Sequence, residues 1–164
     1  ITGKIDRIDR TDGGRFLVID YKTGRSIPTV SDIESGLSLQ LPVYLLAAEH
    51  LLGQAGYTEG VAGVYYQVRD PETCGKKGTF GDAAARGEVF LTRERGLLPT
   101  DRFRETLEGA RQRVLDYARA VRAGRFPLTR HDPGRVCTYC AYRQSCRIDP
   151  QRMHTLDGEV KREK

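Results

Sequence analysis

The stretch that decides the fold is Val18-Ile19-Asp20-Tyr21-Lys22-Thr23-Gly24, where an apolar run ends in charged residues and a glycine. Residues 16–19 are aromatic, aliphatic and β-branched, which predicts a strand. Alternate residues of a strand share a face, so Asp20 and Lys22 are predicted to point to one side of the sheet and Tyr21 to the other. The glycine allows the chain to leave the sheet sharply after them.

A second apolar stretch, residues 5–8, precedes this strand. The turn formers Thr-Asp-Gly-Gly at residues 11–14 lie between the two stretches and predict an antiparallel hairpin. Asp6 on the first strand and Asp20 on the second therefore supply two carboxylates from paired strands. Such a pair can converge on Mg²⁺ or Mn²⁺ and leave positions for water and a phosphate oxygen, as phosphodiester hydrolysis requires. Lys22 would then position the water or neutralise charge in the transition state.

An Asp and a Lys at the end of a strand more often form a solvated surface pair, which contributes under about 1 kcal/mol. An isolated D-x-K pattern favours that interpretation. Here Gln40 and Tyr44 accompany the pattern, four residues apart on a predicted helix and therefore on one face of it. The combination favours a functional site.

Apolar periodicity predicts two helices, over residues 36–52 and residues 101–123. The second has an apolar stripe along one side from Phe103 to Val121. Asp101 can cap its start, and Gly124 marks its end.

The remaining segments predict strands and loops. Residues 61–68, which are β-branched and aromatic, predict a strand, and residues 89–91 predict another. Residues 75–87 contain glycine and lysine without periodicity and predict a flexible loop. The charged residues 157–164 are expected to be frayed. Together the elements predict a single α/β domain with a central mixed sheet flanked by helices.

Charge and hydropathy narrow the class of partner. The chain has 164 residues, and its longest apolar run is interrupted by polar and charged side chains, so we expect no membrane-spanning segment. Residues 1–98 carry 12 basic and 13 acidic side chains, whereas residues 99–164 carry 15 and 9. A basic half next to an acidic site suits DNA, and a solvated arginine-rich helix face is the alternative.

Three cysteines lie close together near the end of the chain, as Cys137, Cys140 and Cys146. This C-x2-C-x5-C spacing is poor for a secreted disulfide framework, so we expect a reducing, cytoplasmic setting. Thiolates at this spacing can bind one tetrahedral zinc or three corners of an iron–sulfur cluster. Buried, unligated cysteines are the alternative, but they rarely fall in a loop with Gly, Pro and Arg.

Three motifs carry a family resemblance. They are Gly3-x-Ile5-Asp6-Arg7-Ile8-Asp9, Val18-Ile19-Asp20-Tyr21-Lys22-Thr23-Gly24 and Gln40-Leu41-Pro42-Val43-Tyr44. The set closely resembles the RecB-like branch of the PD-(D/E)xK nucleases, and most nearly the AddB-type subunits of bacterial helicase-nucleases. The resemblance implies a restriction-endonuclease-like core.

The resemblance also implies how the hairpin binds metal. Asp6 and Asp20 would be ligands of Mg²⁺ or Mn²⁺, the carbonyl of Tyr21 would add a third, and Lys22 would be catalytic. Family members usually carry a Glu or His ligand on a helix before the first strand. This chain begins at Ile1, too late to contain that helix, so we expect a fragment that binds metal weakly and cuts poorly alone.

Other motif residues receive roles by the same resemblance. Gln40 and Tyr44 match the family's Q-x-x-x-Y motif, which contacts DNA or supports the lysine. Asp9 lies on the other strand face from Asp6 and is expected to be structural or to flank DNA.

For the cysteines the resemblance implies a 4Fe-4S cluster bound by Cys137, Cys140 and Cys146, with a fourth ligand upstream of Ile1. Cys74 could substitute for that fourth ligand, but it lies in a different loop and is expected to be a free thiol. The chain would thus comprise a nuclease core at residues 1–130, an iron–sulfur segment at 131–150 and a charged tail at 151–164.

The implied activity is Mg²⁺-dependent hydrolysis of DNA within a bacterial helicase-nuclease that acts in double-strand break repair with an AddA-like partner. One alternative is a stand-alone CRISPR-associated exonuclease, which resembles the chain in the D-x-K hairpin and the C-terminal cysteines. Another is an inactive nuclease fold kept as a DNA-binding scaffold. The intact Asp6, Asp20 and Lys22 argue against the scaffold.

Overall fold

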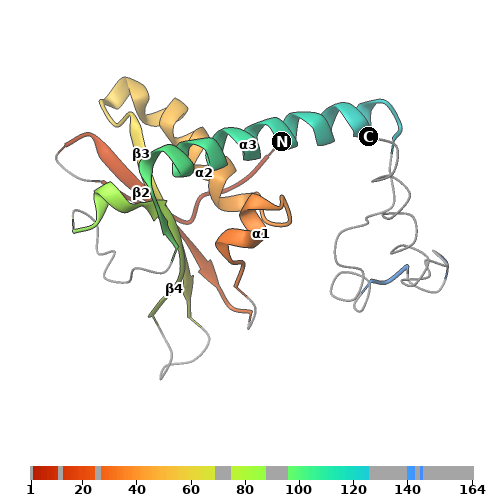
Figure 1. Cartoon of the computed structure of the whole chain (residues 1–164), viewed down its shortest axis with the longest axis horizontal. Helices are drawn as coiled ribbons and strands as arrows, with labels where there is room; N and C mark the ends of the chain where they lie inside the picture. The colour runs from red at the N-terminus through yellow and green to blue at the C-terminus, as the bar shows by residue number, and fades with distance from the viewer. Residues whose placement is uncertain are drawn as a thin grey trace. The chain divides into compact units, whose positions relative to one another are not determined.

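The computed structural model describes residues 2–10, 13–24, 27–68, 75–87, 96–125, 140–142 and 145, and Figure 1 shows the ribbon. The chain divides into two compact units, Ile1–Arg119 and Ala120–Lys164. The sheet and the helices that cover it lie in the first unit. No helix in the described ranges is long and apolar enough to cross a membrane.

The strands of the first unit form one mixed five-stranded sheet in the order β1-β2-β3-β4-β5. The strands are β1 Arg7–Arg10, β2 Arg15–Lys22, β3 Glu59–Gln67, β4 Gly75–Asp82 and β5 Leu97–Leu98. β1 and β2 form the predicted antiparallel hairpin, and β2 pairs in parallel with β3. β4 is antiparallel to β3, and β5 is parallel to β4. The prediction of a central mixed sheet is confirmed.

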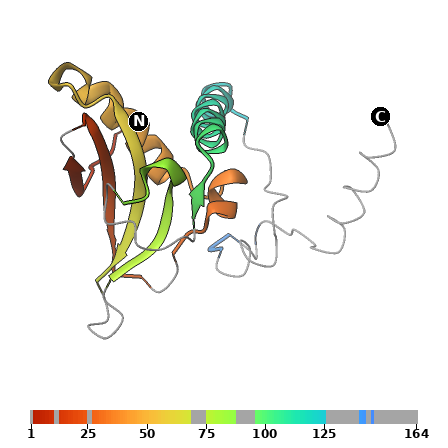
Figure 2. The same ribbon diagram turned by 60° about the vertical axis from the view of Figure 1, so that its left-hand side comes forward.

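The helices are α1 Val30–Glu34, α2 Gln40–Leu52 and α3 Thr100–Arg122, with short 3₁₀ turns η1 Gly53–Ala55 and η2 Ala83–Ala85. Parallel pairing of β2 with β3 requires a crossover, which α1 and α2 supply. Figure 2 shows α1 and α3 on one side of the sheet.

Two hydrophobic clusters cover the two faces of the sheet. The cluster on the helix side includes Phe16, Val18, Leu41, Leu45, Tyr65, Phe80, Phe103 and Leu107. The cluster on the opposite face includes Leu17, Ile19, Val61, Val64 and Ala85. Alternate residues of β2 thus divide between the faces, which places Asp20 and Lys22 on the helix side and Tyr21 on the other.

Helix α2 begins at Gln40, four residues after the predicted start at residue 36. Gly36 has a φ of +81°, which no helical residue adopts, and the Ser38 N–H donates to the Asp32 carbonyl instead of continuing a helix. Pro42 fits because it is the third helical residue, whose N–H has no acceptor within the helix. The predicted start was wrong because apolar residues before Gln40 continue the periodicity past the turn.

Helix α1 lies where the sequence predicts only a polar connection. Its five residues are too short to show periodicity. The available signal was a capping box, because the Thr29 hydroxyl accepts from the Asp32 N–H and the Asp32 carboxylate accepts from the Thr29 N–H.

Strand β4 replaces most of the flexible loop predicted over residues 75–87, so that prediction was wrong. Its sequence, GKKGTFGD, does not alternate apolar and polar residues. Phe80 is nevertheless buried, and the backbone pairs Ala62 with Gly81 and Val64 with Thr79. A Cβ on Gly81 would lie 2.9 Å from the Ala62 Cβ, so glycine permits the approach. The free edge of β3 therefore orders a segment whose own sequence does not predict a strand. The strand predicted at 89–91 and the frayed end at 157–164 lie outside the described residues.

Helix α3 matches its predicted span to within one residue at each end. Asp101 is the second helical residue and lies in the first turn, so its predicted role as the cap was wrong. The predicted end is confirmed, because Gly124 has a φ of +64° and the Arg125 N–H donates to the Ala120 carbonyl. Only the first half of the apolar stripe is buried, since Leu115 is 37% exposed, whereas Phe103 is fully buried.

Candidate active site

The candidate site lies where the end of β2 meets the first residue of α2. Asp20 and Lys22 occupy the last alternate positions of β2, and Gln40 begins α2. The Lys22 Nζ lies 2.7 Å from the Asp20 Oδ2. The prediction that these two side chains share a face is confirmed.

Gln40 joins the two charged groups. Its Oε1 accepts from the Lys22 Nζ at 2.7 Å, and its Nε2 donates to the Asp20 Oδ1 at 2.7 Å. An amide can make both contacts because it carries an acceptor and donors on adjacent atoms. The Tyr44 hydroxyl lies 3.4 Å from the Gln40 Nε2, so the predicted neighbours on the helix face are also in contact. We name Asp20, Lys22 and Gln40 the charge triangle.

One oxygen of Asp20 is left without a hydrogen bond. The residue is 4% exposed, and among the described residues its Oδ2 accepts no hydrogen bond. The Lys22 ammonium, 2.7 Å away, is the ion-pair partner of this oxygen. A carboxylate oxygen has more than one lone pair, so the buried Oδ2 can still accept a further partner.

Asp6 lies directly before β1 and not within it, and its side chain is exposed. Its Oδ2 accepts from the Tyr21 N–H at 3.0 Å. The hairpin pairs Arg7 with Ile19, so one further step of the register brings Asp6 opposite Asp20. The structure therefore brings the Asp6 carboxylate to the backbone next to Asp20, as the hairpin predicts.

The face behind the site carries Tyr21, as predicted, with 40% of the residue exposed. Its ring packs edge to face against Tyr66 at 5.7 Å between centroids. Arg7 lies 3.5 Å from the Tyr21 hydroxyl and makes two bonds to Asp9 of 2.6 and 2.9 Å. Asp9 thus contacts an arginine on the face opposite the charge triangle.

Three contributing residues were not predicted. The Tyr65 ring lies under the Lys22 ammonium, with 4.9 Å from Nζ to the ring centroid. Its hydroxyl lies 3.0 Å from the Ser38 Oγ, and burial raises the pKa of Tyr65 above its ordinary value. Gln67 donates to the Gly24 carbonyl at 2.8 Å and holds the chain just beyond Lys22. Tyr65 and Gln67 reach the site only through the parallel pairing of β3 with β2, which the sequence does not specify.

The oxygen donors at the site match a hard divalent cation. Mg²⁺ is commonly held by one or two carboxylates and completes its shell with water. Asp6, Asp20 and the Tyr21 carbonyl supply that donor type, and the Asp20 Oδ2, which accepts no hydrogen bond among the described residues, can take a further partner beside Lys22. Within the described ranges no three His, Cys, Asp or Glu side chains converge, so a full protein cage is not formed there.

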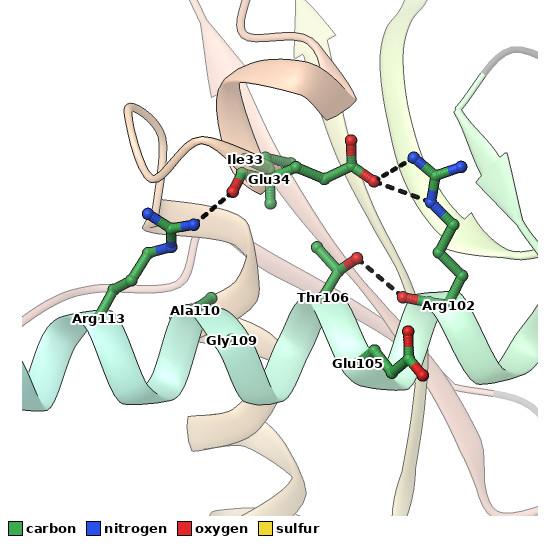
Figure 3. Close-up of a pocket in the computed structure, with 8 residues that line it drawn as sticks. All are labelled: Ile33, Glu34, Arg102, Glu105, Thr106, Gly109, Ala110 and Arg113. Carbon is green, nitrogen blue, oxygen red and sulfur yellow. Dashed lines mark hydrogen bonds and ion pairs between the residues drawn. The ribbon is translucent and has the colours of Figure 1, made fainter. Parts of the chain in front are cut away.

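A separate cavity of about 300 Å³ lies between α1 and α3 (Figure 3). Arg102 bonds to the Glu34 carboxylate at 2.6 and 3.0 Å, and Arg113 donates to the Glu34 carbonyl at 2.8 Å. These contacts tie α1 to α3. The cavity contains none of the predicted site residues.

The predicted cluster ligands are only partly described. Cys137 and Cys146 lie outside the described residues, as does Cys74. Cys140 is exposed and forms no disulfide within the described part of the chain.

Comparison with known proteins gives a family. The family profile described as the PD-(D/E)XK nuclease superfamily matches residues 1–147. A subunit of the ATP-dependent helicase/deoxyribonuclease of Moorella thermoacetica is 30% identical over 92% of this chain and 17% of the relative. The corresponding subunit from Symbiobacterium thermophilum is 28% identical over 92% of this chain and 17% of the relative. That from Clostridium acetobutylicum is 35% identical over 62% of this chain and 9% of the relative. This chain thus spans less than a fifth of the length of these relatives, and it belongs to the PD-(D/E)XK nuclease superfamily.

Proposed function

We propose that this chain is a deoxyribonuclease domain that hydrolyses DNA phosphodiesters with Mg²⁺ or Mn²⁺. The observation that carries the proposal is the charge triangle, in which a buried carboxylate keeps one oxygen free of hydrogen bonds beside a lysine. A purely structural carboxylate that is this deeply buried would gain from a second partner at that oxygen. A metal ligand instead needs the lone pair.

Each residue of the site has a proposed role. Asp6, Asp20 and the Tyr21 carbonyl would hold the cation, which when bound polarises the phosphate and activates water. Lys22 orients the attacking water or neutralises charge on the phosphorane-like transition state. Gln40 keeps Lys22 beside Asp20 through its two 2.7 Å bonds, and Tyr44 supports Gln40.

The wider context is part of the proposal. The relatives are named as one component of an ATP-dependent helicase/deoxyribonuclease. That name supports a nuclease domain in a bacterial helicase-nuclease that acts on DNA in double-strand break repair, together with an AddA-like partner. The match of these relatives over 92% of the chain favours this context over a CRISPR-associated exonuclease.

Lys22→Ala in the full-length protein tests the activity. Cleavage of end-labelled single- and double-stranded DNA in Mg²⁺ should fall by about 100-fold or more, because a positioned charge in the transition state is lost. DNA binding, measured by fluorescence anisotropy in Ca²⁺, should remain. Arg111→Ala is a matched control, because this exposed side chain forms its ion pair with Glu108 on its own helix. Unchanged cleavage in Lys22→Ala would remove the lysine from the mechanism, and an inactive parent protein would favour the scaffold.

We also propose that Cys137, Cys140 and Cys146 bind three corners of a 4Fe-4S cluster. The spacing of the thiols supports this, and Cys140 is exposed and outside any disulfide in the described part. Anaerobically purified full-length protein should be brown and absorb near about 400 nm, as thiolate-bound clusters do. Cys140→Ser should lose that band, whereas the matched variant Cys74→Ser should keep it. Colourless protein with stoichiometric zinc would contradict the cluster.

A further inference from the structure

The Lys22 ammonium is surrounded by three different groups. Asp20 supplies a carboxylate oxygen at 2.7 Å, Gln40 supplies an amide oxygen at 2.7 Å, and the Tyr65 ring face lies 4.9 Å away. The first two groups belong to the motifs that the sequence reveals. The ring belongs to β3, where the register pairs Tyr65 with Asp20, so the two side chains share a face of the sheet.

The Tyr65 ring can hold an ammonium because its face is negative. A cation within about 6 Å of a ring centroid is attracted to that face, and the attraction is stronger when water is excluded. Tyr65 is 1% exposed, so its face offers a dry contact. Only 27% of the Lys22 side chain is exposed, which limits competition from water.

The Tyr65 hydroxyl contacts the turn that leads to Gln40, the third residue of the charge triangle. It lies 3.0 Å from the Ser38 Oγ, and Ser38 stands two residues before Gln40 in the turn that leads into α2. One side chain therefore contacts the lysine through its ring and the start of α2 through its hydroxyl. Burial keeps that hydroxyl neutral, so it remains able to donate to Ser38.

We propose that Tyr65 is a positioning residue of the nuclease site. Its ring fixes the Lys22 ammonium over β3, and its hydroxyl fixes the turn that presents Gln40 to Lys22. This inference rests on the proposed function, because it assigns to Tyr65 the placement of a lysine that acts in hydrolysis.

A role in the core alone makes a different prediction from a positioning role. A core residue would tolerate any ring of the same shape, whereas a ring that holds a cation depends on the electron density of its face. Progressive fluorination of phenylalanine withdraws that density with little change in shape. It therefore separates the two roles without creating a cavity.

The experiment replaces Tyr65 in the full-length protein by phenylalanine and then by 4-fluoro, 3,5-difluoro and pentafluoro phenylalanine. Tyr65→Phe should lower kcat by about threefold or less, because only the Ser38 bond is lost. Fluorination should lower kcat further in steps, up to about tenfold for the pentafluoro ring, with KM for DNA unchanged. The cleavage substrate is an end-labelled DNA oligonucleotide in Mg²⁺, and thermal unfolding checks that each variant is folded.

Tyr57 gives a matched control, since the guanidinium of Arg10 lies 4.9 Å from its ring centroid at the other end of the hairpin. The same fluorinated series at Tyr57 should leave kcat unchanged. A flat kcat across the Tyr65 series would overturn the inference. Lys22→Ala separates the two failures. If Lys22→Ala is inactive and the series is flat, only the role of Tyr65 is wrong. If Lys22→Ala cuts normally, the proposed function fails and the inference fails with it.

Discussion

The two ends of β2 pair their charged side chains in different ways. At the Arg15 end, Glu59 accepts from Arg15 at 2.9 Å, and Arg104 contacts both Glu49 at 2.8 Å and Glu59 at 3.5 Å. Glu49 also accepts from the Gly60 N–H at 2.9 Å.

At the Lys22 end, Asp20 is more buried than either glutamate, yet one of its oxygens has no hydrogen bond among the described residues. Arginines can satisfy a carboxylate with several donors in fixed geometry, whereas the end of β2 uses one lysine and one amide. Each glutamate at the Arg15 end thus has an arginine partner, whereas the Asp20 carboxylate at the candidate site can still accept a further partner. We name the Arg15, Glu49, Glu59 and Arg104 group the arginine network.

The largest expected effect comes from changing the Asp20 carboxylate, whose Oδ2 accepts no hydrogen bond among the described residues. Asp20→Asn keeps the shape of the side chain but removes the proposed carboxylate ligand and its charge. We expect cleavage to fall by about 100-fold or more and Mn²⁺ binding, followed by electron paramagnetic resonance, to weaken. Glu59→Gln in the arginine network is the matched carboxylate-to-amide control and should leave Mn²⁺ binding unchanged. Equal weakening of Mn²⁺ binding in both variants would contradict the proposed contrast between the two ends of β2.

A smaller effect is expected in the arginine network. Arg104→Met keeps the aliphatic stem but removes the arginine partner of Glu49, which keeps its hydrogen bond from the Gly60 N–H. The free energy of unfolding in urea should fall by about 1 kcal/mol, because the pairs are partly exposed and each contributes little. Cleavage should not change. Arg111→Met, on the solvated side of α3, is the control and should not alter stability measurably. A loss of cleavage in Arg104→Met would connect the network to the site.

The smallest effect concerns alkaline pH. Burial raises the pKa of Tyr65, so the folded protein keeps a phenol proton that the unfolded chain loses near about pH 10. This contribution to stability is complete below pH about 10 and is lost as the pH rises through the raised folded-state pKa.

Tyr65→Phe should therefore lose less stability between about pH 9.5 and 11 than the parent, by up to about 1 kcal/mol in urea unfolding. Tyr57→Phe is the control and should follow the parent. If Tyr65→Phe also follows the parent, the hydroxyl is not shielded as the structure describes.

The sequence predicted the site through local periodicity. Asp20 and Lys22 share a face because side chains alternate in a strand, and Gln40 meets Tyr44 because they are four residues apart on α2. These relations need no knowledge of the tertiary fold. They are the part of the site that residue spacing alone determines.

The missed parts depend on contacts between distant segments. Tyr65 is assigned to a strand correctly, but its place under Lys22 follows from the parallel register of β2 with β3. β4 pairs with the edge of β3, and the glycines in β4 interrupt the alternation of apolar and polar residues that would predict a strand. The cap of α1 at Thr29 was missed because the five residues of that helix are too short to show periodicity. Asp101 was taken for a cap because the start of α3 was predicted one residue too late.

The amide of Gln40 has a consequence for which side chains position 40 can accept. A glutamate there would place a second carboxylate against Asp20, and a lysine or arginine would offer no acceptor to Lys22. An amide neither gains nor loses a proton across the pH range in which the protein is folded. Gln40 can therefore hold Asp20 and Lys22 together independently of pH. Position 40 therefore requires a side chain that is both neutral and long enough to contact Asp20 and Lys22, and glutamine meets both requirements.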